Sequence, residues 1–304
     1  TLGRVLFYDR QLSRNKTISC GSCHQQSHGF SDPNRFSRGL NGGLTPRHSM
    51  GIANSRFYPN GRFFWDERAA TLEEQVLQPI QNTVEMDMTL SEVVARVSST
   101  PAYVKLFTNA FGTSSVTSDR ISKAMAQFIR SIVSYLTKFD SAFDANGQPH
   151  FQQTLTAQEF LGMRLFQPVP GLPNISRGCD RCHIATSQIS TQARNIGLDL
   201  NTPGEGRFKS PALRNIAVRG PYMHDGRFGT LMDVVNFYNN GVQNNPNLDP
   251  LLRDQNGQPR RLNLTQPEKD ALVAFLSTLT DNALNADPRF ADPFSNLGHV
   301  RPRP

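Results

Sequence analysis

The sequence predicts an all-α protein made of two similar domains, residues 1–150 and 151–304. Three observations support this fold class. The pattern Cys-x-x-Cys-His occurs twice, 159 residues apart, and the two copies contain all four cysteines of the chain. Other segments repeat at the same offset, which indicates an internal duplication. Apolar residues recur every three or four positions in several segments, as they do on the buried face of a helix.

The repeat extends on both sides of the Cys-x-x-Cys-His motif. Residues 2–7 (LGRVLF) precede the first copy, and residues 161–166 (LGMRLF) precede the second. Downstream, residues 66–72 (DERAATL) match residues 225–231 (DGRFGTL) at the same offset of 159. Agreement at one offset in three places predicts that the halves are homologous.

The expected helices follow from apolar spacing and from start signals. The segment 118–139 has a long apolar stripe, which we interpret as core. The patterns Thr156-x-x-Glu159 and Thr265-x-x-Glu268 are typical of capping boxes at helix starts. Further helices are expected at residues 2–7, 91–97, 230–239 and 266–279. The last 20 or so residues, rich in proline, are expected to form an extended tail.

Composition excludes several classes of protein. Apolar residues make up 37% and charged residues 19% of the 304 residues, which excludes a mostly disordered chain. The net charge of +7 is dispersed and does not form a nucleic-acid footprint. No apolar run approaches the roughly 20 residues that a membrane-spanning helix needs.

The two cysteine motifs predict two covalently attached haem c groups. Cys-x-x-Cys-His is the attachment pattern of c-type haem, in which the thiols form thioethers and the histidine ligates the iron. A redox dithiol or half of a zinc site is the alternative, but no further Cys/His pair lies nearby to complete a zinc shell. The residues concerned are Cys20, Cys23 and His24, and Cys179, Cys182 and His183.

Haem c attachment also predicts the location of the protein. The attachment normally takes place outside the cytoplasm, so a periplasmic or otherwise exported protein is expected. The sequence begins at Thr1 without a methionine, and we expect that a signal peptide has been removed.

The repeat allows the far faces of the two irons to be compared. The helix expected at residues 230–239 contains Tyr238, and the offset of 159 places Pro79 at the corresponding position. Tyrosine can ligate iron through its phenolate oxygen, whereas proline cannot ligate. The second haem is therefore expected to be six-coordinate, and the first five-coordinate with an open face. The alternative for Tyr238 is an aromatic residue of the core.

With these residues in place, the sequence resembles the di-haem cytochrome c peroxidase and MauG family over residues 2–280. The resemblance implies two cytochrome c-like domains, each with one haem. The motifs that carry it, besides the two Cys-x-x-Cys-His sites, are FWDER (64–68), TLEEQ (71–75), PIQN (79–82), VEM (84–86) and PYMHDG (221–226).

Within the family, the resemblance is closest to the MauG-like branch. The better-known peroxidases carry a methionine ligand where MauG-like enzymes carry a tyrosine, and no methionine follows Met232 in this chain. The resemblance therefore implies that Tyr238 ligates the second iron. Tyrosine is a hard anionic ligand that stabilises oxidised iron.

The resemblance also implies the residues of the open haem pocket, where hydrogen peroxide would react. Glu85 corresponds to the distal carboxylate that moves a proton between the peroxide oxygens. Gln75 corresponds to a distal glutamine that donates a hydrogen bond to bound oxygen species, and Pro79 keeps the sixth site open. The alternative for Glu85 is a solvated surface charge.

Trp65, the only tryptophan, occupies the position at which the family has an indole between the haems. Such an arrangement implies that two oxidising equivalents are shared across both irons as a bis-Fe(IV) state. A packed core tryptophan is the alternative. The family also implies a calcium ion between the domains, held by the carbonyls of Arg219 and Pro221. Carbonyl and amide oxygens suit calcium, so Asn54 is preferred over His48 as its side-chain ligand.

The resulting hypothesis is a MauG-like enzyme that oxidises a tryptophan of a partner protein. Known members of this branch build a tryptophan-derived cofactor or convert a tryptophan to kynurenine, and the sequence does not distinguish between these two outcomes. The alternative is a periplasmic peroxidase that reduces hydrogen peroxide with electrons from a small cytochrome or cupredoxin. A third possibility, a non-catalytic electron carrier, needs two six-coordinate irons, which Pro79 disfavours. The sequence does not indicate an oligomeric state.

Overall fold

The structure is a computed structural model that describes residues 1–184, 192–200 and 206–295. It is mostly helical, as predicted, and the described strands are two short antiparallel segments, β1 (Ala193–Arg194) and β2 (Phe208–Lys209). The α-helices are α1 (Leu2–Tyr8), α2 (Cys20–Cys23), α3 (Leu72–Gln81), α4 (Leu90–Ser98), α5 (Pro101–Phe111), α6 (Ser118–Ser131), α7 (Phe151–Thr154), α8 (Ala157–Phe166), α9 (Leu231–Asn236), α10 (Gln266–Ser277) and α11 (Asn282–Ala286).

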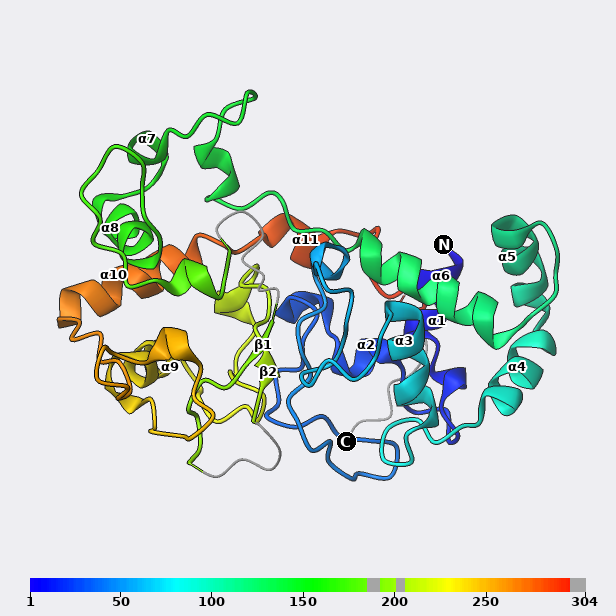
Figure 1. Cartoon of the computed structure of the whole chain (residues 1–304). Coiled ribbons are helices and arrows are strands. Elements are labelled where there is room, and N and C mark those ends of the chain that lie inside the picture. Colours follow the sequence, from blue (N-terminus) through cyan, green and yellow to red (C-terminus); the bar gives the residue numbers. More distant parts are fainter. Residues whose placement is uncertain (185–191, 201–205, 296–304) are drawn as a thin grey trace.

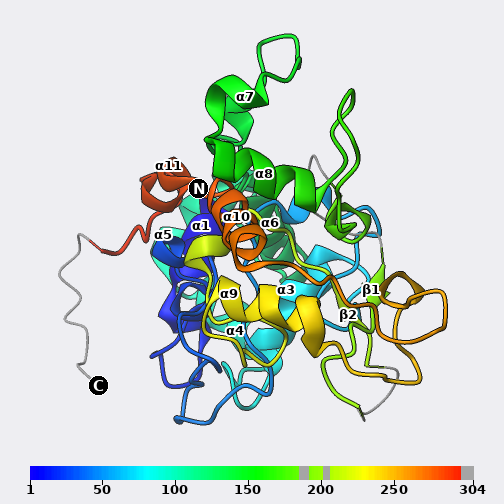
Figure 2. The ribbon, with the colours of Figure 1, turned by 90° about the vertical axis from the view of Figure 1, so that its left-hand side faces the viewer.

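Two hydrophobic clusters divide the molecule into two halves. The first contains Phe7, Phe107 and Met125, and the second contains Met163 and Phe275. Figure 1 shows α1 to α6 on one side of the molecule and α7 to α10 on the other, with β1 and β2 between them. In Figure 2, α8, α9 and α10 face the viewer and α1, α3 and α5 lie behind them.

Each half is built around a pair of closely packed helices. α1 packs on α6, and α8 packs on α10. A Cβ atom at Gly3 would lie 2.0 Å from the Ala124 carbonyl oxygen, and one at Gly162 would lie 1.9 Å from that of Ala271. Both glycines therefore permit a backbone approach that any larger residue would prevent. Gly3 and Gly162 are 159 residues apart.

The same offset relates the starts of α3 and α9. The Thr71 hydroxyl accepts a hydrogen bond of 3.1 Å from the Glu74 N–H, and the Thr230 hydroxyl accepts one of 3.1 Å from the Asp233 N–H. Each accepts as an N-cap, which satisfies a free donor of the first helical turn.

The two capping boxes predicted at helix starts are confirmed. Thr156 and Thr265 form capping boxes with Glu159 and Glu268. The helices expected at residues 91–97 and 266–279 are α4 and α10, with boundaries that differ by one or two residues. No helix of the described residues is long and apolar enough to cross a membrane.

One predicted helix is too long. α6 ends at Ser131 rather than at residue 139, because the backbone there bonds to other segments instead of to itself. The Ile132 carbonyl accepts from the Asn54 N–H, and Asp281 accepts from the N–H groups of Tyr135 and Leu136. The predicted apolar stripe is correct as far as Ile132, which is buried, whereas Leu136 is 60% exposed.

Segments from each half of the sequence pack on the other half of the molecule. The two hydrophobic clusters therefore do not separate at residue 150. Phe139 belongs to the second cluster, whereas Leu284 belongs to the first. The Gln26 amide donates to the carbonyls of Leu284 and Asp287, at 2.9 and 2.8 Å. The segment that follows α11 also lies on the first half, where the Tyr8 hydroxyl donates to the Phe290 carbonyl at 2.8 Å. Residues 296–304 of the predicted tail lie outside the described residues.

Candidate functional site

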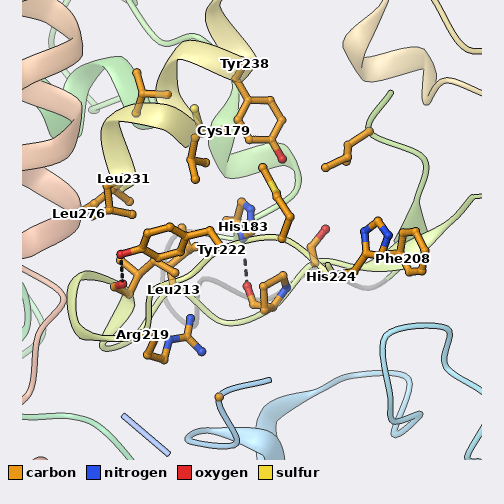
Figure 3. Close-up of a pocket in the computed structure, with 18 of the residues that line it drawn as sticks. Cys179, His183, Phe208, Leu213, Arg219, Tyr222, His224, Leu231, Tyr238 and Leu276 are labelled. Carbon is orange, nitrogen blue, oxygen red and sulfur yellow. Dashed lines mark hydrogen bonds between the residues drawn. The ribbon is translucent and has the colours of Figure 1, made fainter. Parts of the chain in front are cut away.

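The second Cys-x-x-Cys-His motif lies at a large cavity in the second half. Cys179, His183 and Tyr238 all line this cavity, which we call the second pocket (Figure 3). His183 Nδ1 donates to the Pro211 carbonyl at 3.2 Å. This bond fixes the tautomer and leaves Nε2 as the nitrogen that can bind a metal.

Tyr238 reaches the second pocket from an unusual helical turn. α9 ends at Asn236 and the chain continues as a π-helix, Phe237–Gly241, where an uninterrupted α-helix would be the simplest expectation. Backbone carbonyls of this turn accept hydrogen bonds from outside the helix: Asn239 from the Leu262 N–H and Asn240 from the Arg261 guanidinium. π-Turns of this kind are frequent at functional sites.

The environment of Tyr238 suits a cation-bound phenolate. Burial raises the pKa of its hydroxyl, with a further increase from the thiols of Cys182 and Cys179. The phenol therefore stays protonated unless a positive charge lies beside it. A ferric iron would supply that charge and favour the phenolate.

The first motif lies at a separate cavity, the first pocket. Cys20 and Cys23 are the ends of α2, and His24 follows directly. His24 Nδ1 donates to the Phe30 carbonyl at 3.0 Å, which matches the bond made by His183. Burial lowers the pKa of His24, so the imidazole is neutral and its Nε2 can bind a metal.

The distal residues predicted for the first pocket are brought together. Gln75 and Pro79, one turn apart on α3, line this pocket with Glu85 from the following loop. Burial raises the pKa of Glu85, and the charge of Arg68 opposes the shift. The carboxylate is therefore a half-buried group in an apolar site rather than a solvated surface charge. Apolar neighbours in the lining are Phe7, Ile18, Val76, Met86 and Ile129.

Trp65 lies between the two halves. It lines the second pocket and also an outer extension of the first pocket that contains His24, Gln75 and Glu85. Its indole N–H donates to the His48 carbonyl at 2.8 Å. The ring lies edge-to-face against His224, with centroids 6.4 Å apart.

Comparisons with known proteins agree with this arrangement. Residues 1–148 match the family model for di-haem cytochrome c peroxidase. The methylamine utilization protein MauG of Methylophilus methylotrophus is 30% identical, with 93% of this chain and 83% of that protein covered. The chain belongs to the di-haem cytochrome c peroxidase and MauG family.

Two further relatives show the breadth of the family. The cytochrome c551 peroxidase of Nitrosomonas europaea is 32% identical over 92% of this chain and 79% of that protein. The crystal structure of a MauG-like protein associated with microbial copper homeostasis is 31% identical, with a TM-score of 0.82, and the match covers 96% of this chain and 92% of that one. The protein is thus a haem-dependent oxidoreductase, and its family implies two haem c groups.

The residues of the second pocket fit a haem. The wall combines a Cys-x-x-Cys-His motif, apolar side chains and three cations, Arg194, Lys209 and Arg219, and no carboxylate is among the described lining residues. A haem presents an apolar macrocycle and two anionic propionates, which match these two kinds of lining. Within the described part of the chain, the buried Arg219 Nε also has no hydrogen-bond partner.

Asn54 makes a contact that the sequence did not predict. Its amide oxygen accepts from the Ser134 N–H at 2.7 Å, and its amide nitrogen donates to the Ser134 carbonyl at 3.3 Å. The side chain therefore holds the linker after α6, and its role as a calcium ligand stays a prediction. The calcium ion itself, with the carbonyls of Arg219 and Pro221, stays a prediction.

Sequence reasoning missed several residues around the two pockets. Phe208 stacks on His224 with ring centroids 3.7 Å apart, and Arg68 lines the outer extension of the first pocket together with Glu85. The side chain of Arg219 was also missed. The sequence offers one signal for this side chain. The offset of 159 places Asn60 at the equivalent position of the first half, so only the second half has a cation there.

Proposed function

We propose that this chain is a MauG-like di-haem enzyme that uses hydrogen peroxide to oxidise a tryptophan side chain of a partner protein by long-range electron transfer. The observation that carries the proposal is the difference between the two pockets. Tyr238 reaches into the second pocket, whereas Pro79 lines the first. One site is then closed by a protein ligand and the other is open to peroxide.

The first pocket supplies the groups that peroxide chemistry needs. A haem bound through Cys20 and Cys23, with His24 as its ligand, supplies the redox-active iron. Glu85 takes a proton from one peroxide oxygen and returns it to the other, a role that suits a carboxyl group with a raised pKa. Gln75 holds the oxygen species by a hydrogen bond. Pro79 cannot ligate, so the distal face stays accessible.

Trp65 connects the two sites in this proposal. It lines the second pocket and the outer extension of the first, and its ring lies edge-to-face against His224, so an electron can pass between the sites through its indole. Two oxidising equivalents are then shared between the sites, and the anionic Tyr238 stabilises the oxidised form of the second. The substrate tryptophan gives its electrons to the second site without contact with peroxide.

The likeness to a MauG-like protein associated with copper homeostasis supports a partner with a role in copper handling. We also propose that the product is a kynurenine formed from the partner's tryptophan. We propose a periplasmic location, because haem c is attached outside the cytoplasm.

Optical and EPR spectroscopy of the ferric protein, before and after one equivalent of peroxide, tests the proposal. We expect one high-spin haem, one low-spin haem, and a long-lived near-infrared band after peroxide. Tyr238→Met should remove that band. Two low-spin haems that ignore peroxide until they are reduced would contradict the proposal.

The role of Trp65 has its own test. Trp65→Phe should leave both ferric spectra unchanged and suppress the near-infrared band, because the connection between the sites is lost. Tyr58→Phe is a matched control, since Tyr58 lines the same outer extension of the first pocket. An equally strong band in Trp65→Phe would exclude the relay.

The second candidate function is a peroxidase that reduces hydrogen peroxide to water with electrons from a small cytochrome or cupredoxin. Its support is the 32% identity to a cytochrome c551 peroxidase. Steady-state peroxide consumption with a reduced donor protein, in the absence of any tryptophan substrate, would favour this candidate.

A further inference from the structure

Three cations line the second pocket, and they differ in what neutralises them. Arg194 forms an ion pair with Asp249, with Nη1 and Oδ2 2.7 Å apart. The Lys209 ammonium lies 3.4 Å from the centre of the Tyr58 ring and donates to the Arg62 carbonyl. Arg219 has no carboxylate against it among the described residues.

Arg219 is nevertheless almost completely buried, with 5% of its surface exposed. Nη2 donates to the Ala212 carbonyl, and Nε has no hydrogen-bond partner among the residues that the structure describes. An unpaired buried charge is strongly destabilising. No carboxylate among the described residues compensates the charge of Arg219, and its side chain lines a pocket that an anionic ligand can enter.

The guanidinium lies on the side of the second pocket that faces the first half. Nη1 lies 2.2 Å from the point where a Cβ of Gly51 would be, and Cγ lies 2.8 Å from the corresponding point at Gly29. Figure 3 shows Arg219 next to the blue ribbon of the first half. The two glycines make the space in which a side chain from the second half meets the first.

We propose that Arg219 is the counter-charge of a propionate carboxylate of the second haem. The carboxylate pairs with the guanidinium through the free Nε–H and neutralises the charge at the junction of the halves. Arg219 is a positioning residue in this inference, which rests on the proposed second haem site. It acts by fixing the orientation of the haem and the reduction potential of its iron.

The test uses the holoprotein and the midpoint potential of the low-spin haem, measured by optical redox titration. Haem content and the low-spin EPR signal are recorded first for every variant. In Arg219→Gln the ferric-to-ferrous ratio at a fixed potential should rise at least about tenfold, a shift of about 59 mV for one electron. Removal of a positive charge near the iron favours the oxidised form.

Two matched variants separate this effect from general destabilisation. Arg219→Lys keeps the charge and should restore most of the potential. Arg214→Gln removes a second buried arginine of the same segment, but that arginine pairs with Asp140 and does not line the second pocket, so the potential should not change. If Arg219→Gln does not fold, the comparison of Arg219→Lys with the parent protein by resonance Raman should show an altered propionate mode.

Two outcomes overturn the inference, and a third contradicts the function on which it rests. An unchanged potential in Arg219→Gln, with both haems present, excludes the pairing. A parent potential that depends on chloride or phosphate concentration, and loses this dependence in Arg219→Gln, identifies the anion as a solvent ion. A parent protein without a low-spin haem contradicts the proposed function instead.

Discussion

The two halves of the molecule share a close helix contact and differ at the equivalent positions of Pro79 and Tyr238. Gly3 and Gly162 allow the same close helix contact, and His24 and His183 donate the same kind of bond to a backbone carbonyl. Pro79, however, lies within an α-helix, whereas Tyr238 lies in a π-helical turn. In the proposed function, the side chain at this position, Tyr238 or Pro79, decides which haem site is closed and which is open.

The halves also meet through equivalent residues. Trp65 and His224 are 159 positions apart and lie edge-to-face. Both follow a residue with a positive φ, +69° at Phe64 and +73° at Met223, so the same turn occurs twice. One turn carries an indole that can lose an electron and the other an imidazole, which makes the junction asymmetric.

The largest effect on this comparison is expected from Tyr238→Phe. The ring still packs, but the oxygen that closes the second site is lost, so the low-spin EPR signal should be replaced by a second high-spin signal. Tyr222→Phe is the control, because Tyr222 lines the same pocket and its hydroxyl donates to the Ile216 carbonyl at 3.0 Å. A low-spin signal that survives in Tyr238→Phe would assign the ligand to another residue.

Glu85→Gln should slow the reaction of the ferric protein with peroxide by about 10²–10⁴-fold, measured by stopped-flow absorbance. In the parent protein the proton-accepting carboxylate is lost as pH falls through the raised pKa of Glu85. When the rate constant is measured against pH, its fall on the acidic side, the acidic limb, should thus have a midpoint above the ordinary glutamate pKa of about 4.3. The limb should be absent in Glu85→Gln and unchanged in Glu74→Gln, in which an exposed carboxylate of α3 is removed.

Gly3→Ala and Gly162→Ala test whether the halves share their packing. Each should lower the free energy of unfolding by about 1–3 kcal/mol, because the added methyl group meets a backbone carbonyl. Chemical denaturation followed by circular dichroism measures the change. Gly229→Ala, where nothing lies within 4 Å, is the control. A loss of stability in only one of the two variants would show that the contacts are not equivalent.

The smallest effect is expected from Arg68→Gln. The charge of Arg68 lowers the pKa of Glu85, so its removal should move the acidic limb of the peroxide reaction to higher pH. The shift should be a fraction of a pH unit and should shrink with added salt, because the Arg68 side chain is 48% exposed. A shift to lower pH would contradict this assignment of charges.

The features that depend on local spacing could be predicted from the sequence alone. The two Cys-x-x-Cys-His motifs, the capping residues Thr156 and Thr265, and the helical stripe up to Ile132 follow from short-range patterns. The repeat at 159 residues also predicted that Pro79 and Tyr238 stand at equivalent positions. Glu85, Gln75 and Trp65 were predicted by resemblance to the family, and the structure brings all three to the pockets.

Three other features depend on contacts between distant segments, and only the tertiary structure shows them. α6 stops at Ser131 because Asn54 and Asp281 take the hydrogen-bonding groups that would have extended it. The π-helical turn at Tyr238 exists because Arg261 and Leu262 bind its carbonyls. Arg219 is buried because glycines of the other half leave space for it. Each of these outcomes joins residues more than 20 positions apart, and no local pattern specifies such a pairing.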